Sequence, residues 1–228
     1  RVLEHDSTVL ESRVIVGKPK TPTPLLSSRM GQIIVYPTWT IPASIIKDEI
    51  LPALKRNPGY LAQKGFNLYD ASGNEVDPYS VNWSKYKKGI PYKIVQGEGI
   101  GNALGIMKFN FPNEHSVYLH DTNQRGLFQN ENRSLSHGCV RVQNWVGLYN
   151  YLISRDSIVA TENDQPFTAS DSVARWLKQK KKRVIPIKDQ LPIYFRYYTA
   201  AGKNGKLETY QDVYGLDEPI RKMIGSRN

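Results

Sequence analysis

The chain has 228 residues, of which 39% are hydrophobic and 23% charged, and its mean hydropathy is −0.50. This composition indicates a soluble globular protein, and no apolar run approaches the roughly 18 residues that a membrane-spanning helix needs. The formal net charge of +10 favours attraction to polyanions, but the sequence has no nucleic-acid-reading motif, so nucleic acid is not predicted as a partner.

The first 36 residues predict a β region. Val9 to Val16 and Gln32 to Tyr36 are apolar, partly β-branched runs separated by glycine and proline turns. The pattern of apolar residues changes from strand-like to helix-like after Pro37. Ser44 is a candidate cap for a helix whose apolar residues recur at helical spacing, and Pro52 is expected to kink that helix or to divide it in two.

A hairpin is expected over residues 66–79, with its tip at Ser72-Gly73-Asn74. Residues 37–99 are therefore predicted to form a small α+β insertion within a β domain that spans residues 1–228. Strand-like patterns begin again at Ile106 with IMKFNF. The next run, SVYLHD, predicts a strand that ends near Asp121.

Two helices are expected after this strand. Asn144 is a plausible cap for the first, and Val173, Trp176 and Leu177 predict the apolar face of the second. The basic run 178–183 is expected to be the solvated end of that second helix. A further hairpin is predicted around residues 203–205. The expected class is mainly β with helices (α+β).

One stretch, Ser136-His137-Gly138-Cys139, contains the only cysteine of the chain, and His120 precedes it by a gap of fifteen residues. A thiol becomes a nucleophile near neutral pH when a histidine activates it, and a histidine on a separate strand can be aimed at the sulfur more freely than a near neighbour in sequence. We therefore prefer His120 as the base.

Other residues of this stretch suggest supporting roles. Gly138 lets the backbone approach a substrate, so the N–H groups of Gly138 and Cys139 are candidates for an oxyanion hole. Arg141 lies two residues beyond the sulfur and could hold a carboxylate or lock the loop.

Other interpretations of the cysteine stay open at this point. A lone cysteine is often a small buried hydrophobe. A single cysteine excludes an intrachain disulfide and a Cys-x-x-Cys zinc site, but zinc could still bind Cys139, His120 and His137 if His115 or Asp121 supplied a fourth ligand. The combination of histidine, glycine and arginine around the sulfur favours catalysis, and no metal or cofactor is predicted.

At these residues the chain resembles the L,D-transpeptidase catalytic domain family, whose pattern is a histidine, a gap, and Ser/Thr-His-Gly-Cys followed by an apolar residue and Arg or Asn. The insertion that begins IPASIIKDEILPALKRNPGYL resembles the capping subdomain of the large Gram-negative members. The chain departs from the family at Asp121, where many relatives have glycine, and at His137, where the large type often has serine.

The resemblance implies a β-sandwich or barrel-like catalytic fold with the insertion as a lid. It implies that Cys139 attacks the carbonyl of the third residue of a peptidoglycan tetrapeptide stem, that D-alanine leaves, and that an amine accepts the acyl group in a 3→3 cross-link. His120 would be the base and acid, oriented by the backbone carbonyl of Asp121, with His137 accessory. The candidate substrate-binding residues are Tyr118, Ser136, Arg141, Asn144 and Trp145.

By the same resemblance, the partners are donor and acceptor stem peptides, and carbapenem β-lactams would inhibit covalently. We expect a monomer exported to the periplasm of a Gram-negative bacterium. The chain opens without a signal peptide, so it is expected to be a fragment of a longer membrane-anchored or secreted protein. Two rival functions are L,D-carboxypeptidase-like hydrolysis of the same stem and a non-catalytic module that binds the cell wall.

Overall fold

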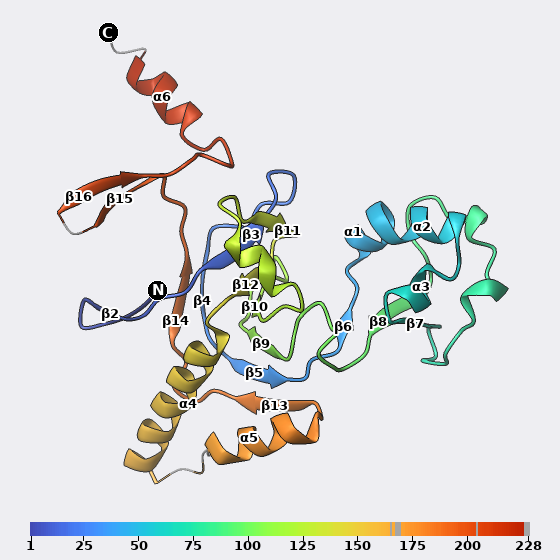
Figure 1. Cartoon of the computed structure of the whole chain (residues 1–228), viewed down its shortest axis with the longest axis horizontal. Coiled ribbons are helices and arrows are strands. Elements are labelled where there is room, and N and C mark those ends of the chain that lie inside the picture. Colours follow the sequence, from blue (N-terminus) through green and yellow to red (C-terminus); the bar gives the residue numbers. More distant parts are fainter. Residues whose placement is uncertain (165, 167–169, 204, 226–228) are drawn as a thin grey trace.

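The structure is a computed structural model that describes residues 1–164, 166, 170–203 and 205–225. A seven-stranded mixed sheet lies at its centre (Figure 1), in the order β11-β3-β12-β10-β9-β5-β13. In that order the strands are Ser134–Ser136, Val14–Gly17, Val140–Val142, Leu119–His120, Met107–Asn110, Gln32–Val35 and Arg183–Pro186.

The two faces of this sheet differ in polarity because side chains alternate along each strand. Ile33, Val35, Met107 and Phe109 point to one face and are fully buried in the main hydrophobic core. Helices α4 (Trp145–Glu162) and α5 (Ser170–Gln179) pack against that core. On α5, Val173 is fully buried, and Trp176 and Leu177 are partly buried against it, which confirms the predicted apolar face.

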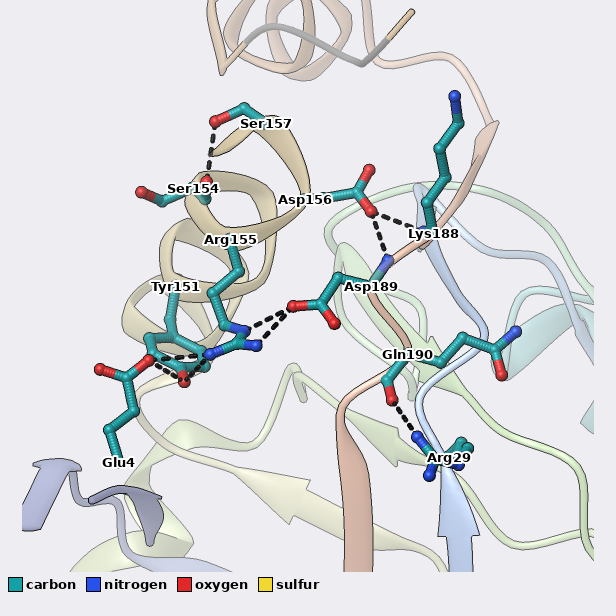
Figure 2. A network of polar contacts seen from close by, with 10 residues as sticks. All are labelled: Glu4, Arg29, Tyr151, Ser154, Arg155, Asp156, Ser157, Lys188, Asp189 and Gln190. Carbon is teal, nitrogen blue, oxygen red and sulfur yellow. Dashed lines mark hydrogen bonds and ion pairs between the residues drawn. The ribbon is translucent and has the colours of Figure 1, made fainter. Parts of the chain in front are cut away.

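A network of polar contacts connects α4 to Glu4 near the N-terminus and to residues 188–189 (Figure 2). The Arg155 guanidinium donates to Glu4 near the N-terminus at 3.0 Å and to Asp189 at 2.6 and 2.7 Å. The buried carboxylate of Asp156 accepts the backbone N–H groups of Lys188 and Asp189. These contacts fix the helix that follows the cysteine segment.

Shorter elements surround this body. Strands β1 (Val2–Glu4) and β2 (Ser7–Leu10) pair with each other, as do β4 (Leu26–Arg29) and β14 (Pro192–Phe195). The apolar run Val9 to Val16 does not form one continuous strand, because residues 11–13 separate β2 from β3. The predicted last hairpin is present as β15 (Ala200–Lys203) and β16 (Lys206–Thr209), which extends from the body together with α6 (Glu218–Gly225) (Figure 1).

None of the helices in the described part of the chain combines the length and the apolar character needed to span a bilayer. The mainly β class with added helices is confirmed.

Residues 39–96 form a second unit beside the main body, coloured cyan to green in Figure 1, and we call it the inserted unit. Its sheet has the order β6-β8-β7, formed by Trp39–Thr40, Lys93–Gln96 and Phe66–Tyr69. It has a hydrophobic core of its own in which Leu54, Leu61 and Ile94 are fully buried. Its helical elements are α1 (Ala43–Ile45), a π-helical turn (Ile46–Ile50), α2 (Leu51–Arg56), α3 (Tyr60–Gln63) and two 3₁₀ turns (Pro78–Ser80 and Trp83–Lys85).

The effect of Pro52 on its helix is a change of hydrogen-bond register. Proline has no N–H to donate, and the residue before it, Leu51, donates to the Ile46 carbonyl across a π-type turn. The helix therefore continues through this point, so of the two predicted effects of Pro52, a kink or a division, the division into two helices is wrong. The predicted cap at Ser44 is also wrong, because the helix begins after Pro42 without a side-chain cap.

The hairpin expected over residues 66–79 is reduced to a single bridge between Tyr69 and Glu75. Asp70 does close a turn by accepting from the Asn74 N–H at 2.9 Å. The returning segment then enters a 3₁₀ turn at Pro78, so it cannot continue as a strand. Strand β7 pairs with β8 instead.

Candidate active site at the ends of the central strands

The predicted histidine lies on β10, and the predicted cysteine directly precedes β12, the parallel strand next to it in the central sheet. In the register of β10 and β12, Leu119 lies beside Val140 and His120 beside Arg141, and the Val140 N–H donates to the Tyr118 carbonyl at 3.0 Å. Leu119 and Val140 are buried in the core. Tyr118, His120, Cys139 and Arg141 therefore alternate toward the other, polar face of the sheet.

The next strand brings Lys108 to the same face. In the register of β9 and β10, Lys108 lies beside His120, and its Nζ lies 3.7 Å from the centre of the Tyr118 ring. The sequence analysis missed this residue. The alternation in IMKFNF, where Met107 and Phe109 are buried and Lys108 is not, was the signal that could have revealed it.

His120 is held as a neutral base. It is 4% exposed, and its Nδ1 is hydrogen-bonded to the backbone carbonyl of Asp121, the contact expected from the sequence. A carbonyl can only accept, so this contact assigns the hydrogen to Nδ1 and leaves the lone pair on Nε2. Burial, together with the charges of Arg141 and Lys108, lowers the pKa of His120 to about 3.

The carboxylate of Asp121 faces away from the reaction chemistry. Its Oδ2 accepts from the Ile106 N–H at 3.1 Å and from Arg125 at 2.9 Å. Gly105 has φ +63°, and a Cβ there would lie 2.2 Å from the same oxygen. The carboxylate therefore fixes the backbone whose carbonyl orients His120.

Cys139 is partly exposed and carries a free thiol. Its Sγ lies 4.0 Å from the backbone carbonyl of Ser116. Burial raises the pKa of the thiol, while hydrogen bonds from Tyr118 and the charges of Lys108 and Arg141 oppose that rise. The thiol thus keeps its proton near neutral pH, and the imidazole on the neighbouring strand is unprotonated. The arrangement supports general-base activation of the sulfur in preference to a resting ion pair.

The turn that leads into Cys139 is closed by Ser136. Its buried hydroxyl donates to the Cys139 carbonyl at 2.6 Å and accepts the Gly138 N–H at 3.1 Å. Gly138 has φ +118°, which glycine adopts readily, and its carbonyl accepts from Thr23 at 2.8 Å.

These contacts correct two of the predictions. Ser136 holds the turn and does not face a substrate. The Gly138 N–H is already engaged by Ser136, so the Cys139 N–H is the group left for an oxyanion.

His137 points away from the sulfur toward the inserted unit. Its Nε2 lies 2.7 Å from Oε1 of Glu49, which also lies 3.8 Å from the Lys18 ammonium. Glu49 belongs to the π-helical turn of the inserted unit, 88 residues earlier in the chain. No sequence pattern links residues so far apart, so the sequence analysis could not have found this contact. In this arrangement His137 contacts the inserted unit, and an accessory role in activating the thiol has no contact to support it.

Three other predicted residues lie as follows. Arg141 donates to the Gln124 side chain at 2.8 Å, while its buried Nε has no partner among the described residues. Asn144 caps α4 by accepting the Gly147 N–H, as predicted for the helix, so its side chain is already used. Trp145 is 9% exposed and belongs to the main core. Asn144 and Trp145 are therefore removed from the set of substrate-binding candidates.

The zinc alternative needs at least three ligating side chains together. Within the described ranges, no group of three or more His, Cys, Asp or Glu side chains is placed to hold a metal ion. Asp121, one of the two candidates for the fourth ligand, is engaged by Arg125.

A thiol, an oriented neutral imidazole and a free backbone N–H on adjoining strands define the class of site used for nucleophilic cysteine chemistry. Residues 1–164 match the model of the L,D-transpeptidase catalytic domain family, named YkuD. The chain is also 38% identical over 212 residues to a Haemophilus influenzae protein described as a "Putative L,D-transpeptidase".

That alignment covers 93% of this chain and 41% of the relative, so the chain spans less than half of that relative's length. The chain belongs to the L,D-transpeptidase catalytic domain family.

Proposed function

We propose that the chain is the catalytic domain of a peptidoglycan L,D-transpeptidase with Cys139 as nucleophile and His120 as general base and acid. The observation that carries the proposal is the neutral His120, oriented by the Asp121 carbonyl, on the strand next to Cys139. The match of residues 1–164 to the family model supports the reaction class.

In the first half-reaction, Nε2 of His120 takes the proton of the Cys139 thiol as the sulfur attacks the carbonyl carbon of the third stem residue. The tetrahedral oxyanion accepts a hydrogen bond from the Cys139 N–H. The carbon–nitrogen bond then breaks, and His120 returns the proton to the amine of the departing D-alanine. The product is a thioester on Cys139.

In the second half-reaction, an amine of another stem attacks the thioester. His120 accepts the proton lost by that amine, the carbon–sulfur bond breaks, and the thiol is restored with that proton. Water competes with the amine for the same thioester, which is how carboxypeptidase-like hydrolysis would arise. We propose that the inserted unit acts as a lid that limits water, and the contact between Glu49 and His137 supports this role.

Because stems are cross-linked outside the cytoplasm, the proposal includes export of the domain to the cell envelope. It also includes covalent inhibition by carbapenems, which would acylate the same sulfur.

The test uses purified tetrapeptide stems and mass spectrometry of the products. Wild type is expected to release D-alanine and to yield 3→3 dimers, and Cys139→Ala should yield none. A carbapenem should add once, at Cys139. Tripeptide without dimer would indicate the hydrolase, and unchanged processing by Cys139→Ala would refute the mechanism. Stem binding without any processing by wild type would indicate the binding module.

A further inference from the structure

A cavity of about 310 Å³ is lined by Ser116 and Tyr118, two residues that contact Cys139. Its wall includes Lys108, Asn110, Asn113, Ser116 and Tyr118. Two of these reach the nucleophile: the Ser116 carbonyl lies 4.0 Å from Sγ, and the Tyr118 hydroxyl is hydrogen-bonded to it. A group bound in the cavity would therefore lie next to the reacting thiol.

Lys108 is the charged group of this cavity. Burial lowers the pKa of its ammonium, and none of the ion pairs among the described residues involves it. Its Nζ lies 3.7 Å from the centre of the Tyr118 ring, which is a weak partner for a partly buried cation. Asn110 follows two residues later on the same face of β9 and adds an amide to the same wall.

Hydrogen bonds of Asn113 fix the part of the cavity wall that includes Ser116. The Asn113 side chain donates to the carbonyls of Phe111 and Val117 and accepts the N–H groups of His115 and Val117. These four bonds fix the loop that presents Ser116, whose φ is +55°. Asn113 has no capacity left for a ligand, so Lys108 and the Asn110 amide remain to bind one, and of these two Lys108 carries the charge.

We propose that this cavity is an anion subsite in which Lys108 binds a carboxylate of the acyl donor and so holds the donor against Cys139. The assignment rests on the proposed function in that it takes the donor to be a stem peptide. Such a donor offers two carboxylates of the same chemistry: the C-terminal one on the leaving D-alanine, and, where the third residue is diaminopimelate, the one on its side chain. A charge-assisted hydrogen bond to a partly buried ammonium discriminates between a carboxylate and a neutral carboxamide.

The test compares three donors: the free tetrapeptide, the same peptide amidated at its C-terminus, and the peptide amidated on the third side chain. Their binding is measured by calorimetry on Cys139→Ala, which cannot turn them over, and their kcat/KM on the active protein. One of the two amides should bind about 10- to 100-fold more weakly than the free peptide, the loss of a hydrogen bond to a charged group. The amide that loses affinity identifies which carboxylate Lys108 binds.

Lys108→Gln should abolish the preference for the free peptide, and Lys108→Arg should keep part of it. Lys85→Gln is the matched control, because Lys85 also lies over a tyrosine ring, that of Tyr86, but in the inserted unit. Lys108 also lowers the pKa of the Cys139 thiol. Loss of that effect in Lys108→Gln would slow all three donors equally and leave the ratio of their kcat/KM values unchanged. The ratio of kcat/KM between the free and the amidated donors therefore separates binding of the carboxylate from activation of the thiol.

The proposed anion subsite would be overturned if Cys139→Ala bound all three donors with equal affinity. It would also be overturned if Lys108→Gln, with unaltered thermal unfolding, kept the preference for the free peptide. Failure of the proposed function has a different signature: the active protein turns over none of the donors. The binding ratio in Cys139→Ala decides the subsite in that case as well.

Discussion

The central sheet and the inserted unit each have a hydrophobic core, but only the sheet carries reactive groups. Strands β9, β10 and β12 place an imidazole and two cations side by side on one face, and the thiol of Cys139 directly precedes β12. The inserted unit meets the nucleophile turn through Glu49, an exposed carboxylate on a π-helical turn. Under the proposed function, the sheet performs the chemistry and the inserted unit limits the access of water.

The first prediction removes the base from the sheet. His120→Gln should lower the rate of Cys139 acylation by about 10²- to 10⁴-fold, the usual contribution of a positioned general base. Intact-mass analysis after timed exposure to a tetrapeptide or a carbapenem measures this rate. Asp48→Asn, an exposed change in the inserted unit, is the control and should react as wild type does. Wild-type acylation by His120→Gln would show that the sulfur does not need this imidazole.

The second prediction separates the two cores. Leu54 is fully buried in the inserted unit, and Leu54→Ala should destabilise it by about 2–5 kcal/mol through lost burial and a cavity. Hydrogen exchange should then rise in residues 39–96 while the central sheet stays protected. Ile33→Ala, at a fully buried site of the main core, should raise exchange in the sheet instead. Equal loss of protection in both regions after Leu54→Ala would mean that they unfold as one.

The third prediction uses pH to test the burial of His120. Its pKa is about 3 in the folded protein and about 6.5 when unfolded, so between these values the unfolded chain binds the extra proton. Stability from this group is therefore complete above pH 6.5 and is lost as the pH falls toward 3. Near pH 5 the loss is about 2 kcal/mol, from a difference of about 1.5 pH units at 1.36 kcal/mol each.

Urea unfolding of wild type and His120→Gln at pH 7 and pH 5 measures this contribution. All ionisable groups except His120 are common to both proteins. The difference between their pH-dependent changes in unfolding free energy therefore isolates His120. Parallel loss of stability in both proteins would show that His120 is not buried in its neutral form.

The sequence predicted what depends on local pattern. Asn144 was identified as a helix cap from its place before an apolar helix, and the alternation around Leu119 placed His120 at a strand end. The same local view misjudged Trp145, because its burial depends on how α4 packs against the sheet. Likewise, the hydroxyl of Ser136 lies in the motif, but only the folded turn reveals that it engages the Gly138 N–H.

The remaining prediction tests the connection between the two regions and has the smallest expected effect. Glu49→Gln removes the charge that faces His137 and Lys18, and both partners of the His137 contact are partly exposed. The stability change should be below about 1 kcal/mol, as for other exposed pairs, and the acylation rate of Cys139 should stay that of wild type.

The ratio of dimer to hydrolysed tripeptide is the sensitive readout for Glu49→Gln. It should fall if the contact holds the inserted unit over the thioester, because a loosened lid admits water. Asp48→Asn is the matched control, since Asp48 lies in the same π-helical turn and pairs only weakly with Lys47, at 3.8 Å. An unchanged ratio in Glu49→Gln would assign this contact to surface packing, and control of water would then have to come from another part of the inserted unit.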